Sequence, residues 1–521
     1  MFSHKIQFMT ILVEPDEGPD QGSLTDYKLP VLTNLGLTAN TNHNLDKIAI
    51  IDYNRGTARH YSFNDIDRLA NNAAGYLRRV GIQQGDRVAI VAKNSAEFVA
   101  VLFGIYRIGA VAVPLNYKTS KADIEYMIKD SNAKLVFCDH TTSALLGSAI
   151  DLQNTPDLFA DCDRIDPIDV SKIDEGLLLY TSGSSGFPKG VIISHKSHLW
   201  VVGRHRKLDR KWGVDRTSII SAPLYHMNGL STTQGGFASY STIVLLPEFN
   251  ARKYLELIQL HKINTLYAVT PMMAMLVNEK PLIDSTDLSS VRGVFMASAP
   301  LSKKLVGEVK HYFPKAWITQ SYGLTEAGPR MFGAHPDKLD KPELSVGYPV
   351  PEISIRLVDG ILQVKSPSMM NGYNNRPDLN KQSFTEDGYF ITNDLFTVDH
   401  NGFYYFAGRA DDMFKSGGNT VYPSKIEEIL ESHSEVQNAV VVGIEDEIKG
   451  KKPYAFVIRT AESVVSEQQL IDYVLANAAV YMHPRRIWFL DTLPLIGSNK
   501  IDKKNLEKLA LEYIAVDLAD K

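Results

Sequence analysis

One stretch constrains this chain more than any other: an apolar run that leads into a loop of small polar residues ending in a lysine. Residues 177–180 are expected to form a buried strand, and a second apolar run, residues 191–193, follows the loop. Oriented N–H groups and hydroxyls can bind a polyphosphate, and glycines let the backbone approach it closely. A lysine adds a mobile cation. The stretch therefore predicts phosphate binding rather than a flexible turn, through Thr181, Ser182, Gly183, Ser184, Ser185, Gly186 and Lys189.

This loop differs from the P-loop of nucleoside triphosphatases. Gly183 and Gly186 are too close for that spacing, and Lys189 is followed by Gly190 rather than by Ser or Thr. A strand is expected after the lysine, so no helix N-terminus points at the phosphates. The stretch instead resembles the phosphate-binding signature of acyl-adenylate-forming enzymes, which include acyl-CoA synthetases, non-ribosomal peptide adenylation domains and beetle luciferases. A single glycine-rich loop is a weak signal, so the other motifs must support it.

The composition is that of a soluble globular protein with more than one domain. The chain has 521 residues, of which 44% are hydrophobic and 22% charged. A net charge of −5 provides no basic field, so nucleic acid is not expected as a partner. Cys138 and Cys162 lack metal or disulfide spacing, which predicts a reducing, cytoplasmic setting. The apolar start is too short to span a bilayer and lacks a cleavage site, so neither a transmembrane segment nor a signal peptide is expected.

The order of the predicted elements indicates an α/β fold. Short apolar strands alternate with amphipathic helices from Ser62, a predicted helix cap, up to a strand at residues 293–296, which favours layered parallel sheets. Asp-Gly and Asn-Gly turns then mark hairpins. The sequence predicts a large N-terminal domain (1–408) of mostly parallel sheets and helices, with a β-rich subdomain at about 345–408, and a small mobile α+β C-terminal domain (409–521).

A second motif, residues 320–328, places an aromatic ring, a hydroxyl and a carboxylate within five positions. Tyr322 could stack on a purine, Thr325 could donate to a phosphate, and Glu326 could hold Mg²⁺. Taken singly, each residue would more simply be explained as part of a polar loop. The resemblance to adenylate-forming enzymes assigns these three roles, and it adds nucleotide contacts at Ser298, Ala299, Pro300, Ser321 and Gly323.

Two further motifs supply charged groups for the nucleotide and the substrate. The resemblance implies that Asp394 holds the ribose, supported by Arg409 and Phe406, although Asn393 stands where the family usually has Gly. It also implies that Lys500, in a C-terminal turn, bridges the substrate carboxylate and the α-phosphate during adenylation. The alternative for each is a solvated surface charge. Near Lys500 the chain departs from the family pattern, which leaves the local geometry open.

The fifth motif, residues 223–229, concerns the acyl substrate. In acyl-CoA synthetases, an aromatic residue or histidine at the position of His226 lines and gates the acyl pocket, whereas a lone histidine on an apolar stretch is more often a core residue. No Asp lies between residues 224 and 230, which argues against an amino acid substrate. The predicted pocket residues lack an ionic partner, so an apolar or aromatic acid is expected; they are His226, Met227, Ala297, Ser321 and Gly323.

The resemblance covers residues 45–510 and implies a two-step reaction with ATP, Mg²⁺ and coenzyme A. A carboxylic acid attacks the α-phosphorus of ATP, pyrophosphate leaves, and a thiol then takes the acyl group from AMP. The small domain is expected to rotate about Asp411 between the steps, and Gly417 and Gly418 are expected to line the channel for coenzyme A.

Several alternatives stay open at this point. Free coenzyme A is the expected acceptor because no carrier module follows the small domain, but the phosphopantetheine of a separate carrier protein is a rival. A catalytically silent nucleotide-binding protein on the same fold is disfavoured because Lys189, Glu326, Asp394, Arg409 and Lys500 are all present. A luciferase-like oxygenase is less expected still, since the chain lacks a terminal peroxisomal tripeptide. The oligomeric state is open between monomer and homodimer.

Overall fold

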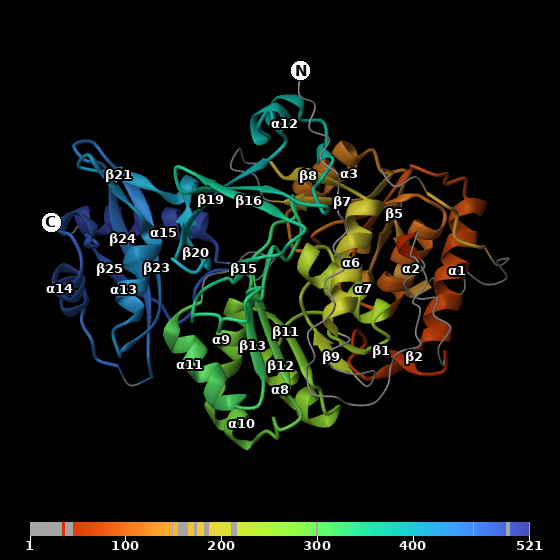
Figure 1. Cartoon of the computed structure of the whole chain (residues 1–521), viewed down its shortest axis with the longest axis horizontal. Helices are drawn as coiled ribbons and strands as arrows, with labels where there is room; N and C mark the ends of the chain where they lie inside the picture. Colours follow the sequence, from red (N-terminus) through yellow and green to blue (C-terminus); the bar gives the residue numbers. More distant parts are fainter. Residues whose placement is uncertain are drawn as a thin grey trace.

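A computed structural model places the predicted elements in layered sheets covered by helices (Figure 1). Among the described residues there are two seven-stranded sheets, a four-stranded sheet, a five-stranded sheet and a two-stranded ribbon. The structure describes residues 34–36, 45–144, 146–147, 149–154, 165–170, 174–181, 187–209, 216–297, 301–461, 463–495 and 501–519.

The predicted phosphate loop connects two strands of the first large sheet. Its apolar flanks form two strands, as the sequence predicted, and these two strands pair antiparallel. Residues 372–373 also pair antiparallel, with the second of them, while the strands beyond the first one run parallel. Their buried, apolar composition is typical of a parallel sheet covered on both faces. The strand order is β18 (Gly372–Tyr373), β8 (Lys189–Ser194), β7 (Glu175–Thr181), β4 (Val111–Pro114), β3 (Arg87–Val91), β5 (Leu135–Cys138) and β6 (Ile150–Asp151).

The second large sheet carries the second motif at the end of an outer strand. All of its neighbouring strands run parallel except the first two of the chain, which form an antiparallel pair. The strand order is β13 (Trp317–Ser321), β12 (Gly293–Ala297), β11 (Thr265–Val269), β9 (Thr217–Ile220), β10 (Thr242–Leu245), β1 (Ile48–Asp52) and β2 (Arg59–Ser62).

Helices fill the space between the two large sheets and cover their outer faces. The first helix begins at the predicted cap, where Ser62 and Asp65 form a reciprocal capping box. One core cluster joins the facing sides of both sheets to α1 (Phe63–Arg79), α2 (Ala96–Arg107), α6 (His195–Asp209) and α7 (Met227–Ala238). The outer faces are covered by α3 (Lys121–Ser131), α8 (Ala251–Leu260), α9 (Thr270–Asn278), α10 (Lys280–Ser285) and α11 (Lys303–Tyr312); α4 (His140–Ser143) and the turn η2 (Leu152–Asn154) complete this half.

The β-rich stretch predicted after residue 345 forms an antiparallel four-stranded sheet beside the large sheets. Its turns include the predicted Asp-Gly turn, where Asp359 and Gly360 both have positive φ. The elements are β16 (Ser354–Val358), β17 (Ile361–Lys365), α12 (Pro377–Ser383), β19 (Phe390–Val398) and β20 (Tyr404–Arg409), preceded by the ribbon β14 (Phe332–Gly333) and β15 (Tyr348–Pro349).

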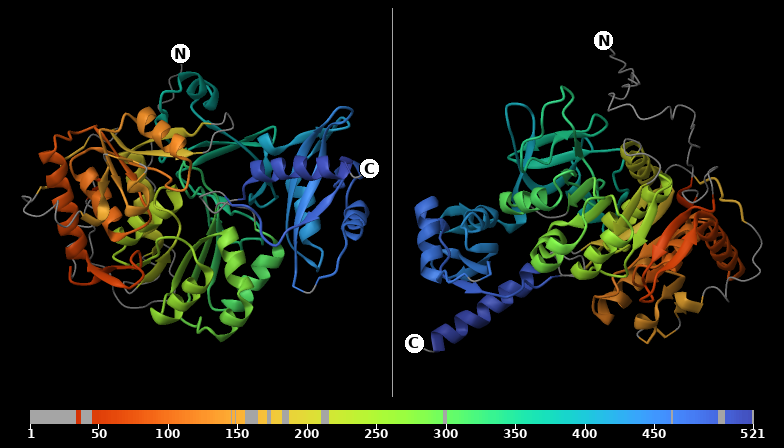
Figure 2. Two further views of the ribbon diagram at one scale, coloured as in Figure 1. Left: turned by 180° about the vertical axis from the view of Figure 1, so that it is seen from behind. Right: turned by 90° about the horizontal axis from the view of Figure 1, so that it is seen from below.

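The last part of the chain forms its own five-stranded sheet with two apolar clusters, and it lies to one side of the rest (Figure 2). The predicted α/β fold with a C-terminal α+β domain is therefore confirmed, while its boundary at residue 409 stays a prediction. None of the helices in the described ranges has the length and apolarity to cross a membrane. The elements are η4 (Ala410–Asp412), β21 (Phe414–Ser416), β22 (Asn419–Val421), α13 (Pro423–Glu431), β23 (Val436–Asp446), β24 (Gly450–Arg459), α14 (Glu467–Asn477), η5 (Val480–Met482), β25 (Ile487–Phe489) and α15 (Lys503–Ala519).

Candidate active site

The hairpin of the predicted phosphate loop holds its two described ends opposite each other. Thr181 on β7 is the register partner of Lys189 on β8. The Lys189 ammonium lies 5.4 Å from the centroid of the Tyr373 ring, on the neighbouring strand β18. The loop residues Ser182, Gly183, Ser184, Ser185 and Gly186 lie outside the described residues.

Tyr373 links the phosphate loop to the second motif. Its hydroxyl donates a hydrogen bond of 3.0 Å to Oε1 of Glu326, and burial together with the Glu326 charge raises the pKa of Tyr373. The Tyr373 side chain therefore contacts both Lys189 and Glu326, the carboxylate predicted to hold Mg²⁺. The sequence motifs missed Tyr373, since only the pairing of β18 with β8 brings it here.

The second motif forms a tight turn at the end of β13. Leu324 and Gly328 exchange backbone hydrogen bonds of 2.9 and 2.8 Å, and the Glu326 carbonyl accepts a bond of 2.8 Å from the Met370 N–H. A Cβ atom on Gly323 would lie 2.2 Å from the carbonyl carbon of Pro329, so only glycine fits there. The turn therefore fixes the backbone that presents Tyr322, Thr325 and Glu326.

The third motif, which contains Asp394, Phe406 and Arg409, contacts the second through Asp394, which is buried (4% exposed). Oδ2 of Asp394 accepts a hydrogen bond of 2.5 Å from the Tyr322 hydroxyl, and Oδ1 lies 3.1 Å from Nε of Arg409. Burial and the Asp394 charge raise the pKa of Tyr322 well above its usual value. Phe406 also belongs to this group, with its ring centroid 6.2 Å from that of Tyr322.

The unusual Asn393 is explained by its backbone. Its φ is +57°, in the left-handed region where glycine is the usual residue and asparagine the best-tolerated replacement. The departure from the family pattern at this position therefore leaves the backbone that leads into Asp394 unchanged.

The residues predicted to line the acyl pocket occupy the ends of two strands and the start of a helix. Ala297 ends β12, and its register partner Ser321 ends β13. His226 precedes α7, which begins at Met227, and its ring centroid lies 4.5 Å from that of Tyr225. Ser298, Ala299 and Pro300, which follow β12, lie outside the described residues.

Two arginines that the sequence motifs missed lie on the same face of this sheet. The Cζ atoms of Arg216 and Arg330 are 5.8 Å and 5.3 Å from the centroid of the Phe295 ring on β12. Arg330 follows the second motif by two residues, a position that could have drawn attention to it. Arg216 precedes β9 and carries no local signal.

The C-terminal candidates are only partly described. Asp411 lies in the short turn η4, directly after Arg409. Gly417 and Gly418 form the tip of the β21–β22 hairpin, with φ values of +56° and +85° that glycine adopts readily. Lys500 lies outside the described residues. The roles of all four in rotation, channel and catalysis stay predictions.

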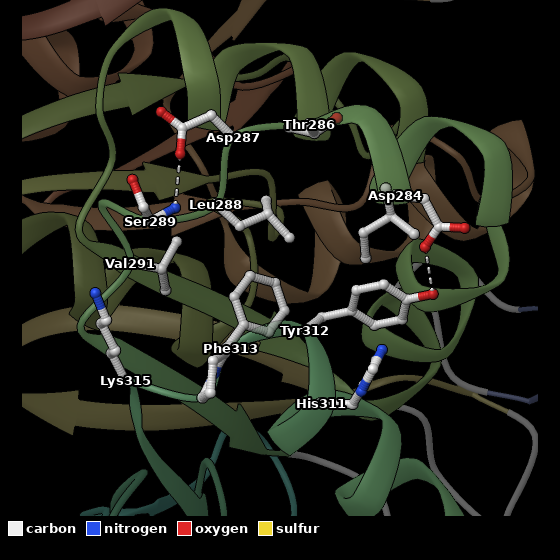
Figure 3. A pocket seen from close by; sticks show the side chains of 12 residues that line it. Asp284, Thr286, Asp287, Leu288, Ser289, Val291, His311, Tyr312, Phe313 and Lys315 are labelled. Carbon is white, nitrogen blue, oxygen red and sulfur yellow. Dashed lines mark hydrogen bonds between the residues drawn. The ribbon is translucent and has the colours of Figure 1, made fainter.

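A surface hollow between the end of α10 and the end of α11 contains none of the predicted residues (Figure 3). Its carboxylates already have partners: Asp284 accepts a bond of 2.9 Å from the Tyr312 hydroxyl, and Asp287 accepts one of 3.0 Å from the Ser289 N–H. We assign this hollow no part in the chemistry.

Comparisons with known proteins agree with the motif geometry. Residues 37–374 match the family described as AMP-binding enzyme, and residues 425–500 match the AMP-binding enzyme C-terminal domain. The chain is 29% identical to the peroxisomal OPC-8:0-CoA ligase 1 of Arabidopsis thaliana, with 89% of this chain and 91% of that protein covered. It is 28% identical to 4-coumarate–CoA ligase 1 of Solanum tuberosum, with 86% and 88% covered.

Solved structures show the same similarity. ATP-bound MatB from Rhodopseudomonas palustris superimposes with a TM-score of 0.82 at 25% identity, covering 92% of this chain and 98% of that one. The o-succinylbenzoate-CoA synthetase of Bacillus subtilis, bound to its acyl-adenylate intermediate, gives a TM-score of 0.78 at 27% identity, covering 91% and 97%. The chain therefore belongs to the AMP-binding enzyme family.

Proposed function

We propose that this protein is an AMP-forming acid–thiol ligase that activates a carboxylic acid with ATP and passes the acyl group to coenzyme A. The observation that carries the proposal is the meeting of three separate motifs in one place. Lys189, Tyr373 and Glu326 form one linked group, and Tyr322, Asp394 and Arg409 form another. The turn at residues 321–329 joins the two groups. Similarity to CoA ligases supports the same reaction.

In the first step, a carboxylate oxygen of the acid attacks the α-phosphorus of ATP, and pyrophosphate leaves. The protein must hold two anions in line and offset the charge that develops on the phosphates. Lys189 and Thr181, with the hydroxyls and N–H groups of the loop, are suited to the phosphates. Asp394 can accept hydrogen bonds from the ribose hydroxyls, and Arg409 keeps that carboxylate oriented. Lys500 would bridge the two reacting anions.

The residues present fit Mg²⁺ at Glu326. Mg²⁺ usually takes one or two carboxylates together with phosphate oxygens and water, and Glu326 provides one carboxylate on the rigid turn. Tyr373 orients it through Oε1. When bound there, the ion would neutralise charge on the phosphates.

In the second step, the thiolate of coenzyme A attacks the acyl carbonyl and AMP leaves. We infer that the C-terminal part rotates about Asp411 between the steps, so that Lys500 withdraws and Gly417 and Gly418 line the path of the thiol. Asp411→Pro is expected to slow thioester formation more than adenylate formation, because proline fixes φ at the pivot. Equal slowing of both steps in single-turnover assays would refute this rotation.

The decisive experiment measures pyrophosphate release with ATP, Mg²⁺ and a panel of acids, with and without coenzyme A. We expect acid-dependent release and an acyl-CoA product. Adenylate that never passes to coenzyme A would instead indicate a carrier-protein acceptor. ATP binding without release for any acid would refute the proposed activity. A cytoplasmic location and the oligomeric state remain expectations that this assay leaves aside.

A further inference from the structure

A cluster of three arginines and a histidine lies on the sheet face where the acyl pocket is predicted. Arg204 and His205 come from α6, Arg216 immediately precedes β9, and Arg330 follows the second motif. His205 and Arg216 are buried, and Arg204 and Arg330 are half-buried. A buried arginine usually has an anion to offset its charge. We call these four residues the cationic cluster, after the positive charges of its three arginines.

Two stacked aromatic rings form the floor of the cationic cluster. Tyr267 on β11 and Phe295 on β12 are register partners, with ring centroids 5.1 Å apart and planes inclined by 27°. Nη2 of Arg216 donates a hydrogen bond of 2.7 Å to the Tyr267 hydroxyl, and its Nε donates one of 2.9 Å to Oγ1 of Thr265. Arg330 contacts the same floor through Phe295. The sheet therefore holds both guanidinium groups in defined positions.

Arg204 and Arg330 differ in how their charges are balanced. Arg204 pairs with Glu352 at 2.8 Å. By contrast, within the part of the chain that the structure describes, no carboxylate oxygen lies within 4.0 Å of the Arg330 guanidinium. Burial, with the positive charges of Arg204 and Arg216, lowers the pKa of Arg330 to about 10. Burial and the nearby arginines also lower the pKa of His205 well below its usual value.

The cationic cluster adjoins the predicted acyl pocket. Phe295 precedes Ala297 by two residues on β12, so the two side chains share a face and lie about 7 Å apart along the strand. The segment before Arg330 folds back onto the pocket: the Ser321 hydroxyl donates a bond of 3.3 Å to the Pro329 carbonyl. Met227 of α7 belongs to the same buried cluster as Phe295. An acyl chain that passes Ala297 and Ser321 would therefore approach Arg330.

We propose that Arg330, with Arg216 beside it, binds a second carboxylate at the far end of the acyl substrate, so that the acid activated is a dicarboxylic acid. This inference rests on the proposed acid–thiol ligase function and names its substrate class. A guanidinium matches a carboxylate with two parallel N–H···O bonds. The proposal revises the expectation of a wholly apolar or aromatic acyl substrate. The part of the substrate between the two carboxylates can be apolar, but its far end is anionic.

The test compares acids that differ only in the second carboxylate. Pyrophosphate release is measured at pH 8 with hexanoate against adipate, octanoate against suberate, and cinnamate against 4-carboxycinnamate. We expect kcat/KM for the best diacid to exceed that of its monoacid partner on the order of 10- to 100-fold, as for a charge-assisted hydrogen-bond pair. Arg330→Met should abolish this preference while leaving the KM for ATP unchanged.

Arg356→Met serves as a matched control, because Arg356 also lies over an aromatic ring, with Cζ 4.1 Å from the Tyr389 centroid, but on the surface. It should leave the preference intact. A monoacid used as well as its diacid partner would overturn the inference, and so would an unchanged preference in folded Arg330→Met. If that variant does not fold, the wild-type comparison still decides. Absence of release with every acid, despite ATP binding, would overturn the proposed function itself.

Discussion

Asp394 is the side chain whose substitution tests the site geometry most directly. Its carboxylate is buried and is held from two sides, by the Tyr322 hydroxyl at 2.5 Å and by Nε of Arg409 at 3.1 Å. Asp394→Asn keeps the shape and one acceptor oxygen but removes the negative charge. The variant therefore separates the electrostatic role of this residue from its role in packing.

The hydrogen bond and the ion pair contribute different amounts to the stability of the protein. A hydrogen bond to a buried charged group contributes about 1.5–3 kcal/mol. The Arg409 side chain is 50% exposed, so its ion pair contributes only about 0–1 kcal/mol after solvent screening. Because asparagine retains a weaker bond to Tyr322, we expect Asp394→Asn to lower the free energy of unfolding by about 2 kcal/mol. Loss of the charged acceptor for the ribose should raise the KM for ATP on the order of 10- to 100-fold.

Urea unfolding and steady-state pyrophosphate release measure these two effects. Asp387→Asn is the matched control, since Asp387 also pairs with an arginine, Arg356, at 2.6 Å, but at an exposed site. It should leave both quantities nearly unchanged. If Asp394→Asn behaves like this control, both in unfolding and in the KM for ATP, the reasoning that places the ribose at Asp394 is wrong.

Substitutions at three other positions test separate parts of the structure. Burial raises the pKa of Glu431 to about 7, above its ordinary value of 4.5, so the protein should lose stability as the pH rises from 4.5 through 7. Glu431→Gln should therefore raise the free energy of unfolding in urea by about 2 kcal/mol at pH 8 but not at pH 4.5. Equal effects of the substitution at both pH values would contradict this. Gly323→Ala would place a methyl group 2.2 Å from the Pro329 carbonyl carbon and should lower the melting temperature and adenylation together, whereas an unchanged enzyme would show that the turn can relax. Asn393→Gly should be tolerated because φ is +57°, while Asn393→Val should cost about 1–2 kcal/mol in unfolding; the reverse order would refute the left-handed assignment.

Local signals predicted the elements that carry the motifs. The apolar runs on either side of the phosphate loop became β7 and β8, and the Ser62 cap started α1 as predicted. These features depend on residues a few positions apart, which is why one sequence suffices to predict them. The loop tip and Lys500, which carry much of the expected chemistry, lie outside the described residues and stay predictions.

Helix α7 shows where local signals fail. Its sequence, with three glycines and two threonines, is a poor helix former and has no clear amphipathic period. The helix is buried along nearly its whole length between the two large sheets, so tertiary packing rather than intrinsic propensity favours it. Such burial depends on elements distant in sequence, so the short-range patterns of the chain give no sign of it.

The same reason explains why the charged and aromatic partners of the site were missed. Tyr373 reaches Glu326 only because β18 pairs with β8, nearly two hundred residues earlier in the chain. Arg216 and Arg330 meet only because β9, β11, β12 and β13 are neighbours in one sheet. The motifs predict the groups that touch ATP, whereas the groups that orient them, and those that we propose select the acid, come together only in the fold.

The position of Arg409 also limits how the proposed rotation can proceed. Arg409 ends β20 and is paired with Asp394, and the predicted pivot Asp411 follows two residues later. A rotation that begins there can leave the ribose contact intact. It must, however, break the hydrogen bond of 2.7 Å from Nζ of Lys304 on α11 to the carbonyl of Val436 on β23, which joins the large and small parts in this structure. The rotation that we propose would thus begin just beyond Arg409 and leave the predicted nucleotide site in place, so that AMP would stay bound while the path for the thiol opens.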